Sequence, residues 1–253
     1  MPASTDKSSS TFVFINRAAD AGPGDALKKR VNAIFQNAVR QPFVKDKITG
    51  PIQIIHPNEN AASLIANLGI QAPEGPLTIS LLSAETPDAF REILDHPSVS
   101  RDLATAEEEF GFKSSDSVFA TERVVYQSTQ SLDNSGMWAA GIFNFPSEPA
   151  GMQAMRQKVD GLANTAKEFP IIKTRLLNSM MFYPTPPHGA MEQHISELGY
   201  PSARPQLVWL FQLSDAAAIQ SILEDQTFQD FFAQLPKEIL AGANLFTADI
   251  SRF

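Results

Sequence analysis

Apolar and polar positions alternate along the chain in blocks that predict strands and amphipathic helices in a regular order. The apolar run from Thr11 to Arg17 predicts a first strand. Leu27, Val31 and Phe35 then recur at helical spacing, and Asp25 just before them is a suitable helix N-cap. The other elements expected in this half are a strand at 52–56, a short helix at 61–68, a strand at 77–82, a helix from 87 and a strand at 118–126.

The second half of the chain predicts the same order of elements. These are a strand at 139–145, a helix at 151–166, a strand from about 173 to 183, a short helix ending at 198–199, a strand at 207–213, a helix near 216–223 and a strand at 245–253. The segment 127–136 is polar and has no periodicity, which predicts a linker. We therefore expect a disordered tail at 1–10 and two domains, 11–126 and 137–253.

The two halves also resemble each other in sequence. FVFIN, ending at Asn16, returns as AGIFN, ending at Asn144, and VFATERVVY at 118–126 returns as LFTADISRF at 245–253. The matching segments stay about 128 residues apart along the chain, a period too long for a solenoid and indicative of a duplicated domain. The order strand–helix–strand–strand–helix–strand predicts an α+β, ferredoxin-like unit. We expect two such units to bury their bare sheet faces against each other in a pseudo-dimeric barrel or sandwich.

Two long segments carry a resemblance to a known family. LTISLLSAETPDAFREILDHPSVSRDL and LVWLFQLSDAAAIQSILEDQTFQDFF each run from a strand into a helix, an ILD or ILE turn and a second helical run. With the element order, they resemble the EthD-like branch of the dimeric α/β-barrel superfamily, over roughly residues 11–253. The resemblance implies a cofactor-free enzyme of secondary metabolism that acts on a small hydrophobic, aromatic or polyketide-like metabolite. Its acid–base chemistry would be isomerisation, cyclisation, dehydration or decarboxylation, the work of an isomerase or a lyase.

The composition limits the kinds of partner and chemistry that we expect for this protein. The formal net charge is −8 and no basic stripe is present, which argues against a nucleic-acid surface. No apolar run is long enough to span a bilayer, and the first residues do not have the pattern of a signal peptide. The chain has no cysteine, so disulfides, thiolate metal sites and cysteine nucleophiles are excluded. We expect a cytoplasmic protein that is a monomer with an internal pseudo-dimer, or a loose homodimer.

Two acidic residues occupy matching positions in the last strand of each half. If Phe246 and its apolar neighbours pack under helices, strand alternation turns Asp249, and Glu122 in the first half, towards the shared interior. A carboxylate in an apolar cavity has a raised pKa and suits general acid–base catalysis. The alternative is a pair of surface acids bound to arginine side chains.

Four further residues match in pairs at strand ends. His56 and Tyr183 each end a second strand before a proline; histidine suits proton transfer, and tyrosine donates to a developing oxyanion. The alternative is that both rings only cap the core. Asn16 and Asn144 end the first strands, where asparagine orients a substrate carbonyl or makes a turn hydrogen bond to the backbone.

The remaining candidates occur in the second half alone. His188 and His194 are six residues apart, a spacing that does not put them on one helical face, so we expect no metal site. His194 stands where the first half has Leu64 and is a catalytic candidate, while His188 and Trp209 are candidates for substrate binding. No phosphate-binding glycine loop or nucleophile elbow is found, and we expect no cofactor.

The residues left over predict a pocket of Phe, Met, Leu and Trp side chains with a few polar groups, suited to a small apolar or aromatic molecule. Two alternatives to the cofactor-free enzyme stay open. One is a non-catalytic protein that binds small hydrophobic molecules. The other is a haem-binding relative, because Met191 to Gly199 is similar to haem-ligating segments of the wider superfamily.

Overall fold

The computed structural model describes residues 10–19, 24–58, 73–111, 117–128, 136–186, 189–200, 205–233 and 237–253. The predicted helix at 61–68, most of the predicted linker, and His188 lie outside these residues. The strands are β1 (Ser10–Arg17), β2 (Gln53–Asn58), β3 (Leu77–Ala84), β4 (Ser117–Ser128), β5 (Met137–Asn144), β6 (Leu176–Pro184), β7 (Gln206–Leu213) and β8 (Asn244–Arg252). The helices are α1 (Gly24–Arg40), α2 (Pro42–Lys45), α4 (Pro87–Asp95), α5 (Pro97–Phe110), α6 (Pro149–Ala166), α7 (Pro170–Arg175), α8 (Gly189–Glu197), α9 (Ala216–Glu224), α10 (Gln226–Phe232) and α11 (Lys237–Leu240).

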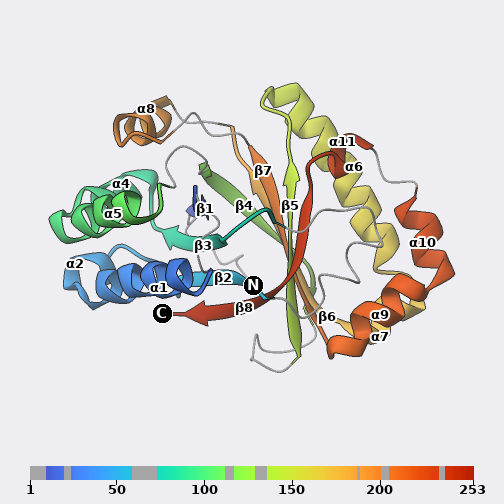
Figure 1. Ribbon diagram of the computed structural model, residues 1–253. Coiled ribbons are helices and arrows are strands. Elements are labelled where there is room, and N and C mark those ends of the chain that lie inside the picture. Colours follow the sequence, from blue (N-terminus) through green and yellow to red (C-terminus); the bar gives the residue numbers. More distant parts are fainter. Residues whose placement is uncertain are drawn as a thin grey trace, which may run out of the picture.

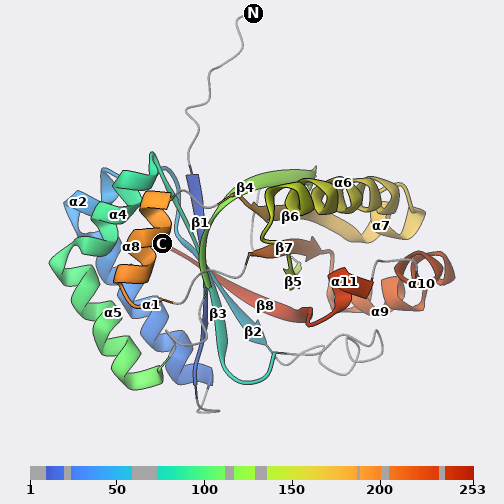
Figure 2. The same ribbon diagram turned by 90° about the horizontal axis from the view of Figure 1, so that it is seen from above.

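The eight strands form one closed antiparallel barrel in the order β1-β3-β2-β8-β5-β7-β6-β4. Each half therefore contributes four adjacent strands, and the halves meet at two seams, β2 with β8 and β4 with β6. The helices lie in two groups on opposite sides of the barrel (Figures 1 and 2). Because the barrel is closed, each of these eight strands is paired on both sides.

The strand registers at the two seams repeat each other. In the first seam His56 pairs with Asp249, and in the second Tyr183 pairs with Glu122. His56 and Tyr183 are therefore counterparts, as the sequence predicts, and so are the two acids. Each fourth strand crosses to the second strand of the other half, which ties the two halves together by backbone hydrogen bonds.

Apolar side chains form three buried clusters. One fills the barrel interior and includes Val13, Ile15, Trp138, Phe246 and Ala248. A second lies between the first half's strands and its helices, and a third lies between the second half's strands and its helices. The barrel interior is therefore packed core, and the two outer layers are the places where a ligand site is to be sought.

The face assignment made for the last strands is wrong. Phe246 and Ala248 point into the barrel interior, so the alternate residues Thr247 and Asp249 point outward towards helices. Both faces of a strand in a helix-covered barrel are buried, and alternation alone does not tell which one is inside.

Helix boundaries follow local signals in the sequence. α4 begins after Thr86, whose hydroxyl accepts a hydrogen bond from Ala89 N at 3.1 Å, and has Pro87 at its first position. α5 ends at Phe110 and is capped by Gly111, which adopts a left-handed φ of 60° that glycine reaches without strain. One boundary was predicted wrongly: residues 173–175, expected in a strand, belong to α7, which starts at Pro170.

Helix α8 belongs to the second half in sequence but packs on the first half. Ile195 and Tyr200, in and just after this helix, are part of the first half's outer cluster. Figures 1 and 2 both place α8 beside α4 and α5. Within the described part of the chain, none of the helices has the length and apolar character needed to cross a membrane.

Candidate functional site

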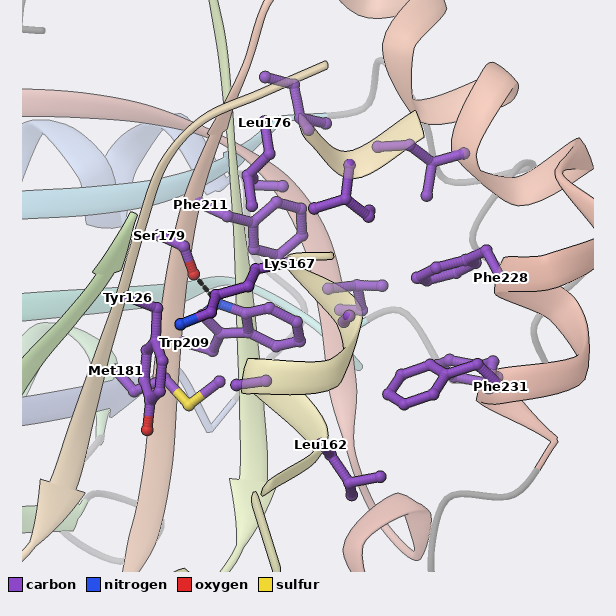
Figure 3. Close-up of a pocket in the computed structure, with 18 of the residues that line it drawn as sticks. Tyr126, Leu162, Lys167, Leu176, Ser179, Met181, Trp209, Phe211, Phe228 and Phe231 are labelled. Atoms are coloured by element: carbon purple, nitrogen blue, oxygen red, sulfur yellow. Dashed lines mark hydrogen bonds between the residues drawn. The ribbon is translucent and has the colours of Figure 1, made fainter. Parts of the chain in front are cut away.

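The second half encloses a cavity of about 160 Å³ between the outer face of its strands and helices α6, α7, α9 and α10. Almost every wall residue is apolar, and Figure 3 shows aromatic side chains gathered round it from strands and helices. Its lining includes Ala139, Phe143, Met181, Trp209, Phe211, Ile219, Phe228 and Phe231. Trp209, predicted from the sequence as a binding residue, thus lies in the cavity wall.

The cavity arises because small residues stand where the first half has phenylalanines. Phe12 of β1 pairs with Leu82 in β3 and with Ala120 in β4. In the second half, the residue at the same place in the strand pairing is Ala139 of β5. It pairs with Phe211 in β7 and with Thr247 in β8. By the same registers, Gly141 is the counterpart of Phe14.

A third substitution lies in the covering helix. Phe90, fourth residue of α4, stacks on Phe12 at 3.7 Å between ring centroids. Ile219 is the fourth residue of α9 and lines the cavity. The first half fills this space with three phenylalanine rings. In the second half the Phe143 ring lies against Gly141, and the cavity remains beside Ala139 and Ile219.

Four of the wall residues that the structure describes carry polar groups. Ser179 Oγ accepts a hydrogen bond from Trp209 Nε1 at 2.9 Å, so these two polar groups satisfy each other. Lys167 Nζ donates to Asn164 Oδ1 at 2.8 Å. The fourth, Tyr126, reaches the wall from β4, the strand that the first half contributes to the second seam.

The hydroxyl of Tyr126 belongs to a network of hydroxyl and carboxylate groups. It donates to Asp160 Oδ1, which also accepts a hydrogen bond from Tyr183 at 2.7 Å, and the two hydroxyl oxygens are 2.9 Å apart. Arg156 Nε lies 3.8 Å from the other oxygen of Asp160. Its two terminal nitrogens bind Glu122 in a bidentate ion pair at 2.6 and 2.7 Å.

Burial and hydrogen bonding hold both tyrosines in the protonated form. Burial, reinforced by the hydrogen bond to Asp160, raises the pKa of Tyr126 to about 12. Burial also raises the pKa of Tyr183 well above its usual range, as do its hydrogen bonds with Tyr126 and Asp160. At neutral pH both are therefore hydrogen-bond donors.

The first seam holds a related network with different chemistry. His56 Nε2 lies 3.0 Å from Asn32 Oδ1, and Lys28 Nζ binds Asp249 Oδ2 at 2.9 Å. Burial, followed by the charge of Lys28, lowers the pKa of His56 to about 4, so its ring is neutral at pH 7. His56 is only 2% exposed and belongs to this network, which adjoins the filled half of the molecule.

Glu122 and Asp249 do not face the barrel interior as predicted. Both lie outside it in exposed ion pairs, Glu122 with Arg156 of α6 and Asp249 with Lys28 of α1. The hydrogen bonds from Arg156 lower the pKa of Glu122. Burial pushes the pKa of Asp249 up, but hydrogen bonds from Lys28 and Asn58 outweigh it and hold that pKa below its usual range. Each pair links the first helix of one half to the last strand of the other.

Replacing these acids is expected to have small effects. Glu122→Gln and Asp249→Asn should each change the free energy of unfolding by less than about 1 kcal/mol, because exposed ion pairs are screened by water. Chemical denaturation of each variant measures this, with ligand binding to the cavity as the second readout. If Glu122→Gln lost ligand binding to the cavity, the Glu122 carboxylate would have a direct role in the site.

The other predicted residues lie away from the cavity. Asn16 is buried beside Thr78 on the helix side of β1. Asn144 is exposed and donates to Ala241 O at 3.0 Å. The register makes Arg17, not Asn16, the counterpart of Asn144, so their predicted match is off by one residue.

His194 of α8 lies 3.2 Å from Asp95 of the first half and does not line the cavity. Among the described wall residues no histidine is found, so a haem with His194 as its iron ligand does not fit this cavity. The described residues also include no group of three or more potential histidine, cysteine or acidic metal ligands.

No protein-family model and no curated protein matches the chain, but solved structures do. A protein of Fusobacterium nucleatum subsp. nucleatum, provisionally named a monooxygenase, is 8% identical over 96% of this chain and 93% of its own, with a TM-score of 0.53. An anthrone oxidase-like protein is 9% identical over 98% of this chain and 94% of its own, with a TM-score of 0.59. The chain has the fold of the dimeric α/β barrels. At these identities the likeness establishes the fold alone.

The sequence analysis named Tyr183 and Trp209 as candidates but did not name Tyr126, Asp160 or Arg156. A signal was present: Arg156 and Asp160 are four residues apart on one helix, at the positions where α1 has Lys28 and Asn32. Nothing in the sequence indicated that Tyr126 crosses the seam to meet them, because that contact depends on the pairing of β4 with β6.

Proposed function

We propose that the cavity binds a small aromatic molecule and that the protein catalyses proton transfer on it, with Tyr126 as the catalytic residue. One observation carries the proposal. Of the wall residues that the structure describes, Tyr126 is the one whose hydroxyl is hydrogen-bonded to a carboxylate. An apolar pocket with one such group is the usual form of a small-molecule site.

The size of the cavity limits the ligand. An engineered cavity of about 150 Å³, lined by Leu, Ile and Phe, binds benzene. A cavity of about 160 Å³ with similar walls therefore suits one aromatic ring with small substituents. Two rings would need side chains such as Phe231 of α10 to move, because that ring lies at the wall.

The geometry suits removal of a proton from the carbon beside a carbonyl group. The oxygen of Tyr126 accepts the substrate proton while the tyrosine passes its own proton to Asp160 Oδ1, the atom it already contacts. The substrate C–H bond breaks, the tyrosine O–H bond re-forms, and Asp160 holds the proton gained. Tyr183 and Arg156 are positioning residues, since Tyr183 donates to the same oxygen of Asp160 and Arg156 lies beside the other oxygen. The resulting enolate leads to isomerisation or to loss of a leaving group.

The test is deuterium exchange at the carbon between ring and carbonyl of phenylacetone, a one-ring ketone, in D₂O followed by NMR. The protein should accelerate exchange, and Tyr126→Phe should slow it by about 100-fold, the usual contribution of one acid–base group. Tyr200→Phe is the matched control, because Tyr200 lies in the first half's outer cluster. Ala139→Phe restores the ring present in the filled half and should abolish both binding and exchange.

A second candidate is a non-catalytic binder of the same molecules. It is favoured by the fact that the Tyr126 hydroxyl is already engaged by both Asp160 and Tyr183. Phenylacetone that binds without exchange would support this candidate over the enzyme. A cavity that binds no one-ring aromatic compound would defeat both.

We interpret the two halves, 11–126 and 137–253, as tandem copies of a ferredoxin-like unit, related to the EthD-like branch. The repeated seam registers support this, because His56–Asp249 and Tyr183–Glu122 occupy the same places in the two seams. We further propose that the chain acts in the cytoplasm as a monomer or loose homodimer. The internal barrel already supplies the second sheet that such a fold needs.

A further inference from the structure

Lys167 brings a positive charge to the apolar cavity. It directly follows α6 and is the one charged residue among the wall residues that the structure describes. Figure 3 shows its side chain crossing in front of Trp209. Its hydrocarbon stem lines the cavity, while its ammonium group makes an exposed hydrogen bond beside the cavity, where the charged group of a ligand can stay hydrated.

The charge of Lys167 acts on the adjacent carboxylate of Glu168, but in the described part of the chain the two form no ion pair. Lys167 Nζ donates to the neutral amide oxygen of Asn164 at 2.8 Å, and in the described part of the chain it forms no ion pair with a carboxylate. The adjacent Glu168 binds Lys173 instead, at 2.7 Å. The whole chain carries a net charge of −8, so acidic residues are plentiful. Lys167 nevertheless has no ion-pair partner among the described residues.

We infer that the ligand is an aromatic carboxylate, with its ring in the cavity and its carboxylate on the ammonium group of Lys167. This inference rests on the proposed function of the same cavity and names its substrate class. A carboxylic acid is fully ionised at neutral pH, whereas a simple phenol has a pKa near 10 and is mostly neutral. A point charge such as a lysine ammonium therefore selects carboxylates over phenols and alcohols.

The experiment compares benzoate with benzyl alcohol, which has the same ring and no charge, binding to the full chain by ligand-observed NMR. Benzoate is expected to bind about tenfold more tightly, as one charge-assisted hydrogen bond gives. Lys167→Met keeps the apolar stem and should remove the preference, and Lys167→Arg should keep it. Lys158→Met removes one exposed charge from α6 and should leave the preference intact.

The outcomes separate the two proposals. Equal affinities for benzoate and benzyl alcohol, or a preference that survives in Lys167→Met, would overturn the carboxylate assignment while leaving an aromatic-binding cavity in place. Binding of neither compound would instead overturn the proposed function. A preference that weakens as salt is added, in the natural protein but not in Lys167→Met, would support the ion pair.

Discussion

Replacing Phe90 by alanine is expected to lower the free energy of unfolding by about 4 kcal/mol, the range found for buried phenylalanines. Phe90 is fully buried, stacks almost parallel on Phe12 at 3.7 Å and lies 5.5 Å from the Phe14 ring. Removing it leaves a cavity that well-packed neighbours cannot close. Equilibrium denaturation with a chemical denaturant measures the loss.

The matched variant is Ile219→Phe in the second half. It adds a ring at the equivalent position, which there borders the open cavity. Insertion of extra atoms into a packed core costs about 1–3 kcal/mol, but here the ring has space to enter, so we expect a change below about 1 kcal/mol. A large destabilisation by Ile219→Phe would contradict the contrast between a filled and an open half.

The second large effect concerns pH. As pH falls from 6.5 to 4, the protein is expected to lose up to about 3 kcal/mol of stability through His56 alone. The pKa of His56 is lowered in the folded state from 6.5 to about 4. Between these values the unfolded chain binds a proton that the folded chain does not, so acid favours unfolding. Above pH 6.5 the histidine is neutral in both states and contributes no pH dependence.

The check is a set of denaturation curves between pH 4 and 7 for the natural chain and for His56→Gln. Glutamine is polar but does not titrate, so the variant should show a shallower decline, and the difference between the two profiles isolates His56 from the acidic groups. Identical profiles would show that His56 is protonated in the folded protein or is less buried than its 2% exposure indicates.

Much of the fold follows from local patterns. The apolar runs and helical spacings predicted every described strand to within a few residues, except where Pro170 starts α7 before β6. The repeat also predicted correctly that His56 and Tyr183 occupy matching places, because the shift between halves is the same for β2 and β4. The prediction that Asn16 and Asn144 match was wrong. The strand pairing makes Arg17 the counterpart of Asn144, and a shift of one residue moves a side chain to the opposite face of the strand.

Local sequence patterns did not predict where the cavity lies. The sequence analysis turned Glu122 and Asp249 towards the barrel interior, since a sequence pattern does not distinguish two buried strand faces. Trp138 and Trp209 both read as apolar strand residues, yet Trp138 lies inside the barrel and Trp209 faces the cavity.

By itself the sequence determined the order of elements, the resemblance between the two halves and the absence of cysteine chemistry, because these depend on local pattern and residue identity. Only the tertiary structure decided which half is open, since that depends on whether Phe12 or Ala139 meets the helix above it. It also decided that Tyr126 of one half joins Asp160 of the other. Barrel closure brings these residues together, and closure is set by pairing between strands far apart in the chain.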